Sequence, residues 1–373
     1  MEQILRTLIG LPTVTGDHVA SSQALNYITD FTQQRGMHVR RFESNGFLSL
    51  VATTTPHDLT PTVLLVAHVD TVPGPPEMLS LRVEDGNYLG RGVYDMKSGL
   101  AAFLQAIDML KDELPHLSLG LMVTADEEVG GRNGVGHLVQ HGYRPKVCII
   151  PDGGDNWRIE TFEKGTQWIK LEAHGIAGHA SRPWEGEHAI HKLLGALADI
   201  RTVFPTDVGR EETILSVGVV KGGTTANQLA EYAEAMLDVR TGSKTSHSQV
   251  FTQVAQACEP HEVLATLLVD DPPCMNSLED PYIARFKDLI VATVGDWGGP
   301  AYSYGMTDGR YFSNHGIPCI ITMPEGGGWH AANEWASVKG CDQYSQIVQQ
   351  FIREVAMRPL QVENPQQVMQ KVA

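Results

Sequence analysis

The sequence lacks the features of several classes of protein. Its five cysteines, at positions 148, 258, 274, 319 and 341, are scattered and odd in number. None of them has Cys-x-x-Cys spacing, so neither a disulfide framework nor a thiolate zinc site is indicated. No apolar run approaches the ~20 residues that cross a bilayer, and the N-terminus has no basic-then-apolar signal pattern. We therefore expect a reduced, cytoplasmic protein.

Positive charge is also scarce. The 373 residues include 28 Lys and Arg against 44 Asp and Glu, which gives a net charge of −16. This balance disfavours nucleic acids and anionic membranes as partners. The hydrophobic share of 42% is ample for globular packing. Because the chain is too long for one ordinary core, we expect two domains.

Apolar runs alternate with helical periodicity in the first part of the chain. Short apolar runs at 62–67, 119–125 and 146–150 predict buried strands. Between the first two, apolar residues recur at helical spacing over 97–111. Strands that alternate with helices predict an α/β fold, with a mixed but mainly parallel sheet flanked by helices.

The pattern changes near residue 165. Strand and helix signals then follow in the order β-α-β-β-α-β, which is typical of a split βαβ, ferredoxin-like domain. The α/β pattern resumes with a helix at 281–294 and a strand at 319–323. We therefore expect a catalytic domain in two parts, 1–164 and 272–373, with a domain inserted at 165–271.

Residues of metal-binding type follow four of the predicted strands. They are His68, the pair Glu127 and Glu128, Asp152 and, after a Gly-rich turn, His330. Open α/β sheets bind ligands at the carboxyl ends of their strands, so these side chains are expected to converge. Taken singly, each has a simpler interpretation as a turn or surface residue. A crowded group of carboxylates, however, would repel unless a cation neutralised it.

Asp95 and Asp70 extend this group. Asp95 lies in a Gly-rich turn that opens a helix, and Asp70 shares a strand face with His68 and could orient its ring. Asp95, Glu128 and Asp152 with a bound hydroxide would balance two divalent ions, one carboxylate bridging them. Donors without thiolate suit zinc, with cobalt or manganese as alternatives. Glu127 is then left as the general base.

These motifs together resemble the co-catalytic dinuclear zinc peptidase/deacylase family, which includes glutamate carboxypeptidase, aminoacylase, acetylornithine deacetylase and succinyl-diaminopimelate desuccinylase. The matching motifs span nearly the whole chain, at 67–73, 90–97, 124–128, 151–152, 178–181, 238–240, 307–310 and 330–334. The resemblance implies a phosphorylase/hydrolase-like zinc peptidase core with a ferredoxin-like lid.

The resemblance also implies a role for each matching residue of the metal site. His68 and Asp152 would hold one zinc, and Glu128 and His330 would hold the other. Asp95 would bridge the two ions. Glu127 would be the base and Asp70 the residue that orients His68.

The inserted domain carries further residues that the resemblance marks. It would form a homodimer in which His179 reaches the partner's active site and stabilises the oxyanion. Asn227 and Arg240 match positions that bind the substrate carboxylate. Thr307 lies in a substrate loop at 305–310, which has Gly-Met-Thr where many relatives have Gly-Gly-Thr. Closure of a lid would place hinges near 163–166 and 270–275.

The substrate stays open at this point. Several carboxypeptidase-like and deacylase relatives carry Glu at the position of Asp152, and the resemblance links an Asp there to peptidases and dipeptidases. Gly309 and Arg310 instead favour the desuccinylases, so the lead interpretation is a dipeptidase or carboxypeptidase-like hydrolase and the alternative is a deacylase of N-acyl amino acids. A third interpretation is a metal- or peptide-binding protein without catalytic activity. The presence of Glu127 beside a full set of ligands argues against it. Serine hydrolase chemistry lacks a Gly-x-Ser-x-Gly elbow.

Overall fold

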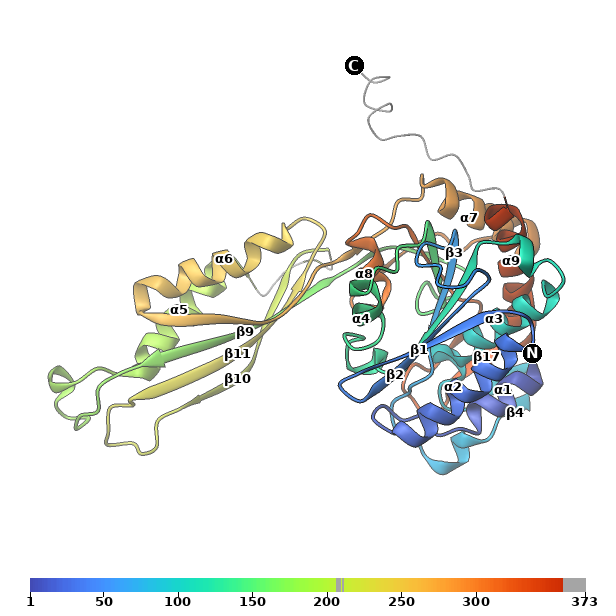
Figure 1. The fold of residues 1–373 in the computed structure, drawn as a ribbon. Helices are drawn as coiled ribbons and strands as arrows, with labels where there is room; N and C mark the ends of the chain where they lie inside the picture. Colours follow the sequence, from blue (N-terminus) through green and yellow to red (C-terminus); the bar gives the residue numbers. More distant parts are fainter. Residues whose placement is uncertain (206–208, 210, 358–373) are drawn as a thin grey trace, which may run out of the picture. The chain divides into compact units, whose positions relative to one another are not determined.

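The structure is a computed structural model that describes residues 1–205, 209 and 211–357. By its internal contacts the chain forms two compact units (Figure 1). The first comprises 1–161, 275–303 and 307–357, and the second comprises 162–274 with 304–306. The second unit is therefore inserted in the sequence of the first.

A six-stranded sheet forms the centre of the first unit. Its order is β1 (His38–Ser44), β2 (Phe47–Thr53), β6 (Leu119–Thr124), β3 (Val63–His68), β7 (Val147–Ile150) and β15 (Cys319–Ile321). The last four strands are parallel to one another, whereas β2 pairs antiparallel with both of its neighbours, β1 and β6. Every residue of β3, β6, β7 and β15 is buried. The predicted mixed, mainly parallel sheet is confirmed.

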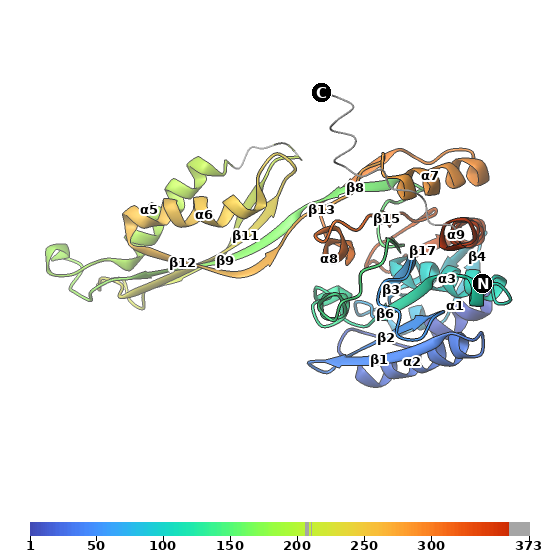
Figure 2. The ribbon, with the colours of Figure 1, turned by 45° about the horizontal axis from the view of Figure 1, so that its top comes forward.

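Helices cover both faces of this sheet. Those of the first unit are α1 (Glu2–Ile9), α2 (His18–Gln33), α3 (Ser98–Met109), α4 (Val135–Gln140), α7 (Pro281–Val294), α8 (Gly309–Ser313) and α9 (Val338–Met357). Figures 1 and 2 show α8 on one side of the sheet and α3 and α9 on the other. Aromatic contacts of Tyr344 with Phe103 and Phe286 join α9 to α3 and α7.

Two small sheets connect distant parts of the chain. One has the order β16 (Gly326–Gly327), β17 (Trp335–Ser337), β5 (Asn87–Leu89) and β4 (Arg82–Glu84). The other has the order β13 (Cys274–Met275), β8 (Ile159–Glu163) and β14 (Pro300–Ser303). Because β17 pairs antiparallel with β5, the segment before β17 lies beside the segment after β5.

The second unit is an antiparallel sheet with two helices. Its elements follow in the order β9 (Gly165–His174), α5 (Ala189–Val203), β10 (Ile214–Gly222), β11 (Tyr232–Thr241), α6 (His247–Cys258) and β12 (Val263–Asp271). The sheet order is β10-β11-β9-β12. Alternate residues of β11, such as Ala235 and Leu237, are buried in a core shared with α5 and α6. This is the β-α-β-β-α-β order expected for the inserted segment.

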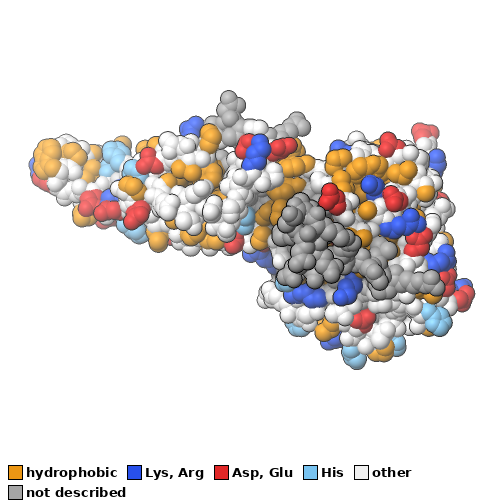
Figure 3. All heavy atoms as spheres, turned by 90° about the horizontal axis from the view of Figure 1, so that it is seen from above, with side chains coloured by type: hydrophobic (Ala, Val, Ile, Leu, Met, Phe, Trp, Pro, Cys, Tyr) orange, Lys and Arg blue, Asp and Glu red, His pale blue; other side chains and the backbone are white. Residues whose placement is uncertain are grey.

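The molecular surface carries charge of both signs. On the face that Figure 3 shows, outside the grey atoms, acidic and basic side chains are interspersed. The excess of negative charge therefore forms no single acidic patch on the visible part of that face. Within the described ranges, no helix has both the length and the apolar composition needed to cross a membrane.

Candidate metal centre

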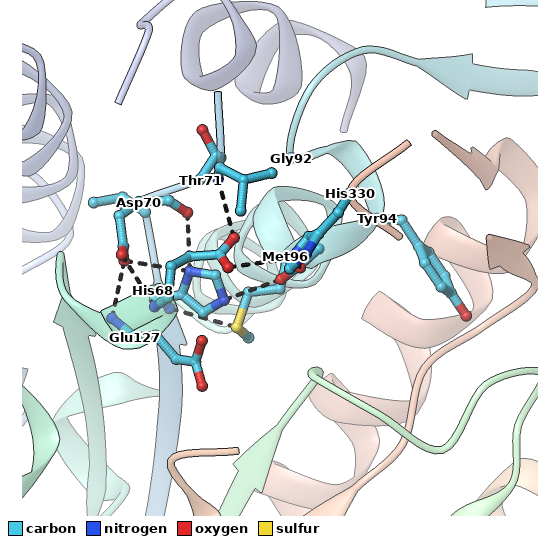
Figure 4. Close-up of polar contacts among 12 residues, drawn as sticks. His68, Asp70, Thr71, Gly92, Tyr94, Met96, Glu127 and His330 are labelled. Carbon is cyan, nitrogen blue, oxygen red and sulfur yellow. Dashed lines mark hydrogen bonds and ion pairs between the residues drawn. The ribbon is translucent and has the colours of Figure 1, made fainter. Parts of the chain in front are cut away.

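His68 lies at the carboxyl end of β3 with its ring oriented by Asp70 (Figure 4). The His68 Nδ1 atom is 3.0 Å from the backbone oxygen of Asp70, and the Asp70 carboxylate is 3.4 Å away. When Nδ1 donates its proton to that carbonyl, Nε2 keeps a lone pair for a metal ion. His68 Nε2 is buried and makes no hydrogen bond among the described residues, although Asp95 Oδ1 lies 3.2 Å from it.

The Asp70 carboxylate supports the turn that carries the two glutamates. It accepts hydrogen bonds from the backbone N–H groups of Glu127 and Glu128, both at 3.3 Å, and from Thr15 Oγ1 at 3.0 Å. These glutamates begin the single-turn helix η4 (Glu127–Val129) after β6. Asp70 therefore positions His68 chiefly through its carbonyl group and η4 through its carboxylate.

Asp95 lies between His68 and His330. Its Oδ1 atom is 3.2 Å from His68 Nε2, and its Oδ2 atom is 3.0 Å from His330 Nε2. Asp95 belongs to the short helical segment η2 (Val93–Lys97), which follows Gly92 at φ +74°. A Cβ atom on Gly92 would meet Thr71 Cγ2 at 2.5 Å, so the turn that presents Asp95 requires glycine.

The metal-type residues form two adjacent groups of three. In one, the ligand atoms of His68, Glu127 and Asp152 all lie within 4.8 Å of one another. In the other, those of Asp95, Glu128 and His330 do so, with His330 Nε2 3.1 Å from Glu128 Oε2. The structure thus brings together all six residues that the sequence singled out. Their separate roles stay a prediction.

The electrostatics of these groups favour bound cations. Burial raises the pKa of Glu127, and Asp152 raises it further. Burial and the Asp95 charge raise the pKa of Glu128. Burial also acts to raise the pKa of Asp95, but hydrogen bonds from His330 and His68 outweigh it and lower that pKa. Divalent ions would neutralise this crowded set, and nitrogen and carboxylate donors without thiolate fit zinc.

Thr307 lies at the start of α8, in the first unit. It is buried, and its hydroxyl oxygen accepts a hydrogen bond from Gly309 N at 3.1 Å. Arg310 of the same helix donates to the backbone oxygens of Thr307 at 2.6 Å and Gly130 at 2.5 Å. Since Gly130 directly follows η4, these bonds connect the predicted substrate loop to the turn that carries Glu127.

His179 and Asn227 lie together in the second unit. Both are exposed, and their loops pair through a hydrogen bond from Ala180 N to Asn227 O at 3.0 Å. The His179 Nδ1 atom lies 2.8 Å from Ser181 Oγ. The structure therefore groups two predicted residues that are 48 positions apart in the sequence.

Arg240 lies near the other end of β11. Its Nε and Nη2 atoms donate to the two carboxylate oxygens of Asp238 at 2.8 and 3.1 Å, and Nη1 donates to Thr166 at 2.8 Å. The strand runs from Tyr232, close to Asn227, to Thr241. Eight extended residues therefore separate Arg240 from the start of β11, a distance of about 26 Å at ~3.3 Å per residue.

Comparison of the sequence with known proteins identifies a family of peptidases. The sequence profile described as peptidase family M20/M25/M40 matches residues 64–354, which is most of the chain. This chain belongs to that family. The family resemblance inferred from the motifs is confirmed, and the chain is a hydrolase that acts on amide bonds.

The known proteins to which this chain is similar have differing names. A succinyl-diaminopimelate desuccinylase of Corynebacterium glutamicum is 28% identical over 268 residues, 69% of this chain and 70% of that protein. A protein named probable carboxypeptidase from Aspergillus flavus is 34% identical over 206 residues, about half of each chain. The crystal structure of a tripeptidase from Staphylococcus aureus has a TM-score of 0.76 at 21% identity, covering 96% of this chain and 98% of its own, which shows a shared fold.

The sequence did not indicate the role of two buried charged residues that hydrogen-bond the backbone segments around the candidate metal centre. Glu334 was part of a matching motif without a role, and its buried carboxylate bonds the segment around Asp95. Arg310 was read as a hint about the substrate, yet it is only 2% exposed and bonds backbone groups. The available signal was that each is a charged residue within a matching motif whose other residues already had a predicted role.

Proposed function

We propose that this member of the M20/M25/M40 family is a dinuclear zinc-dependent hydrolase. It cleaves an amide or peptide bond in a small substrate with a free carboxylate, as a dipeptidase or carboxypeptidase does. One observation carries the proposal: two groups of three donors meet at Asp95, with Glu127 within 4.8 Å of the donor atoms of His68 and Asp152. Cobalt or manganese are alternatives to zinc, because the donor set suits all three.

Each residue has a role in this proposal. His68 and Asp152 hold one ion, Glu128 and His330 hold the other, and Asp95 bridges them. The bridging role is supported by the two Asp95 oxygens, each of which faces a different histidine. Asp70 keeps the His68 ring in the tautomer that exposes Nε2.

Glu127 acts as the general base and acid. The bound ions would polarise the scissile carbonyl and lower the pKa of water. Glu127 takes a proton from the attacking water while the water oxygen bonds to the amide carbon. It returns this proton to the amine nitrogen when the carbon–nitrogen bond breaks. A pKa raised by burial and by Asp152 makes the Glu127 carboxylate a stronger base than an exposed one.

His179 and Asn227 serve the active site of the partner in a homodimer. Within one unit, Arg240 lies about 26 Å along β11 from Tyr232, and the pair His179 and Asn227 lies near the Tyr232 end of that strand. One small substrate cannot contact both sets from the same unit. This separation supports an arrangement in which His179 stabilises the oxyanion in trans.

Arg240 binds the substrate carboxylate, and Thr307 contributes to the substrate loop. The guanidinium group has five N–H donors, three of which bond Asp238 and Thr166. These bonds fix the orientation of the planar guanidinium group, and its remaining donors suit a planar carboxylate. We also propose that the protein works in the cytoplasm, where its five cysteines would stay reduced.

The second candidate function is deacylation of an N-acyl amino acid. It is favoured by the similarity to the desuccinylase of C. glutamicum. A panel of dipeptides and N-acetyl and N-succinyl amino acids, assayed with and without a chelator, separates the two. Cleavage of dipeptides alone supports the first function, and cleavage of the acylated amino acids alone supports the second. Failure to cleave either class in the zinc-loaded state would refute both.

A further inference from the structure

We propose that Glu334, together with Arg91, is a positioning residue that holds Asp95 and His330 in their metal-binding geometry. The inference rests on the metal site of the proposed function and adds to it a residue that touches neither metal nor substrate. Glu334 and His330 lie in one loop, whereas Arg91 and Asp95 lie about 240 positions earlier.

The Glu334 carboxylate is fully buried and accepts four hydrogen bonds. Its Oε2 atom accepts from Arg91 Nη1 at 2.8 Å and from Gly92 N at 2.9 Å. Its Oε1 atom accepts from Tyr94 N at 2.8 Å and Asp95 N at 3.1 Å. Three of the four donors are consecutive or nearly consecutive backbone groups of the turn that presents Asp95. Glu334 therefore determines the path of that turn.

Arg91 connects the same carboxylate to the other ligand segment. Its Nη1 atom bonds Glu334, and its Nη2 atom donates to the backbone oxygen of His330 at 3.2 Å. His330 has φ +57°, a left-handed conformation that is uncommon for residues other than glycine. The bond to its carbonyl group helps to hold this conformation. One ion pair thus fixes the backbones of both residues whose side chains meet at 3.0 Å.

The sheet topology explains why Glu334 can reach this turn. Glu334 directly precedes β17, and Gly90 directly follows β5. The antiparallel pairing of Trp335 with Leu89 brings these two strand ends together. The pairing of β17 with β5 therefore places Glu334 beside η2.

The chemistry of the four donors requires a carboxylate. An ionised carboxylate offers about four acceptor sites, whereas a carboxamide offers one oxygen and an NH2 group that only donates. In Glu334→Gln two of the four donors would face this NH2 group, with almost no change in side-chain volume. The substitution thus perturbs the turn of Asp95 and leaves every predicted metal ligand in the chain.

The test measures zinc affinity on the full chain. Wild type and E334Q are stripped with a chelator and titrated with Zn²⁺ in competition with a chromophoric chelator, and the melting temperature of each metal-free protein is recorded. We expect two ions per wild-type chain and a 10- to 100-fold weaker affinity for at least one ion in E334Q, the usual cost of losing an outer partner.

Asp280→Asn is the matched control. Asp280 also accepts two backbone N–H groups, at 2.9 and 3.2 Å, but it caps α7 in the same unit. We expect it to bind zinc as wild type does. Should E334Q fail to fold, Arg91→Lys takes its place, since lysine cannot bond Glu334 and His330 in the same fork geometry.

The outcomes separate this inference from the function on which it rests. Wild-type zinc affinity in a folded E334Q protein would overturn the positioning role, whatever its melting temperature, and would leave the proposed function intact. A wild-type chain that binds no zinc would overturn the proposed metal site and the inference together. Weaker zinc binding in E334Q but not in D280N supports the inference.

Discussion

The buried carboxyl group of Glu160 predicts a measurable dependence of stability on pH. Glu160 lies on β8 and is only 6% exposed. Its Oε1 atom accepts a hydrogen bond from Gly154 N at 2.9 Å, and its Oε2 atom is buried without a hydrogen bond among the described residues. The pKa of Glu160 is raised from 4.5 to about 7, because burial and the Asp155 charge raise it more than the Gly154 hydrogen bond and Arg158 lower it.

The sign and size of the effect follow from this pKa. Because the folded state binds the proton more tightly than the unfolded state, Glu160 stabilises the fold fully below about pH 4.5. This contribution is lost as the pH rises to about 7. A pKa raised by this amount corresponds to about 3 kcal/mol in the free energy of unfolding, at ~1.4 kcal/mol for each pH unit. Glu160→Gln, which cannot ionise, removes the dependence.

The assay is urea unfolding of metal-free wild type and E160Q between pH 4.5 and 8.5. We expect nearly equal free energies of unfolding at the acid end, and E160Q more stable by about 3 kcal/mol above pH 7.5. Comparing the two proteins at each pH cancels other groups that titrate in this range. Glu354→Gln is the control: hydrogen bonds from Arg285 lower the pKa of Glu354, so its ionised form stabilises the fold above about pH 4.5. We therefore expect this variant to be less stable than wild type by a nearly constant amount across the same pH range. A difference between wild type and E160Q that stays constant with pH would refute the reasoning.

Three further predictions concern the proposed active site. Glu127→Gln should keep zinc binding and lower kcat by about 10²- to 10⁴-fold, as expected for loss of a general base; a near-wild-type rate would contradict the assignment. Removal of metal by a chelator should abolish hydrolysis and lower the melting temperature, since ligands that bind only the folded state stabilise it; Zn²⁺ should restore both, and full activity of the metal-free protein would argue against the metal site. Mixed dimers of E127Q and H179A chains, each carrying a different tag, should regain activity because one of their two sites is complete. No recovery in dimers shown to contain both tags would exclude the role of His179 in trans.

Long apolar segments made most of the fold predictable from the sequence. The strands β3, β6 and β7 and the helix α3 were expected because buried strands and amphipathic helices leave strong local patterns. The strands β4, β5, β16 and β17 were not expected. Each has only two or three residues, too few to show a period of two, and the pairing that joins them into one sheet is that of β17 with the distant β5. The helix α8 was not expected either, because five residues are too few to show a helical period.

The candidate site was predictable in its residue types and less so in its contacts. His68, Asp152 and the two glutamates could be found because each follows a buried strand. No pattern in the sequence indicates that Asp70 contacts His68 chiefly through its backbone carbonyl oxygen. Such a choice between a backbone and a side-chain acceptor depends on a few tenths of an ångström, which no local pattern encodes.

The sequence by itself determined the α/β class, the inserted segment, the family and which residues are candidates for the metal site, because these depend on periodicity, chain order and residue chemistry. Only the tertiary structure decided which donors form each group of three, how Arg91 and Glu334 connect η2 to the loop of His330, and that Arg240 lies far along β11 from Asn227. The physical reason is the separation along the chain of the residues that interact. Burial and helical spacing act over a few residues, whereas these contacts join backbone and side-chain atoms that are separated by up to about 240 positions and meet only when the sheets pair.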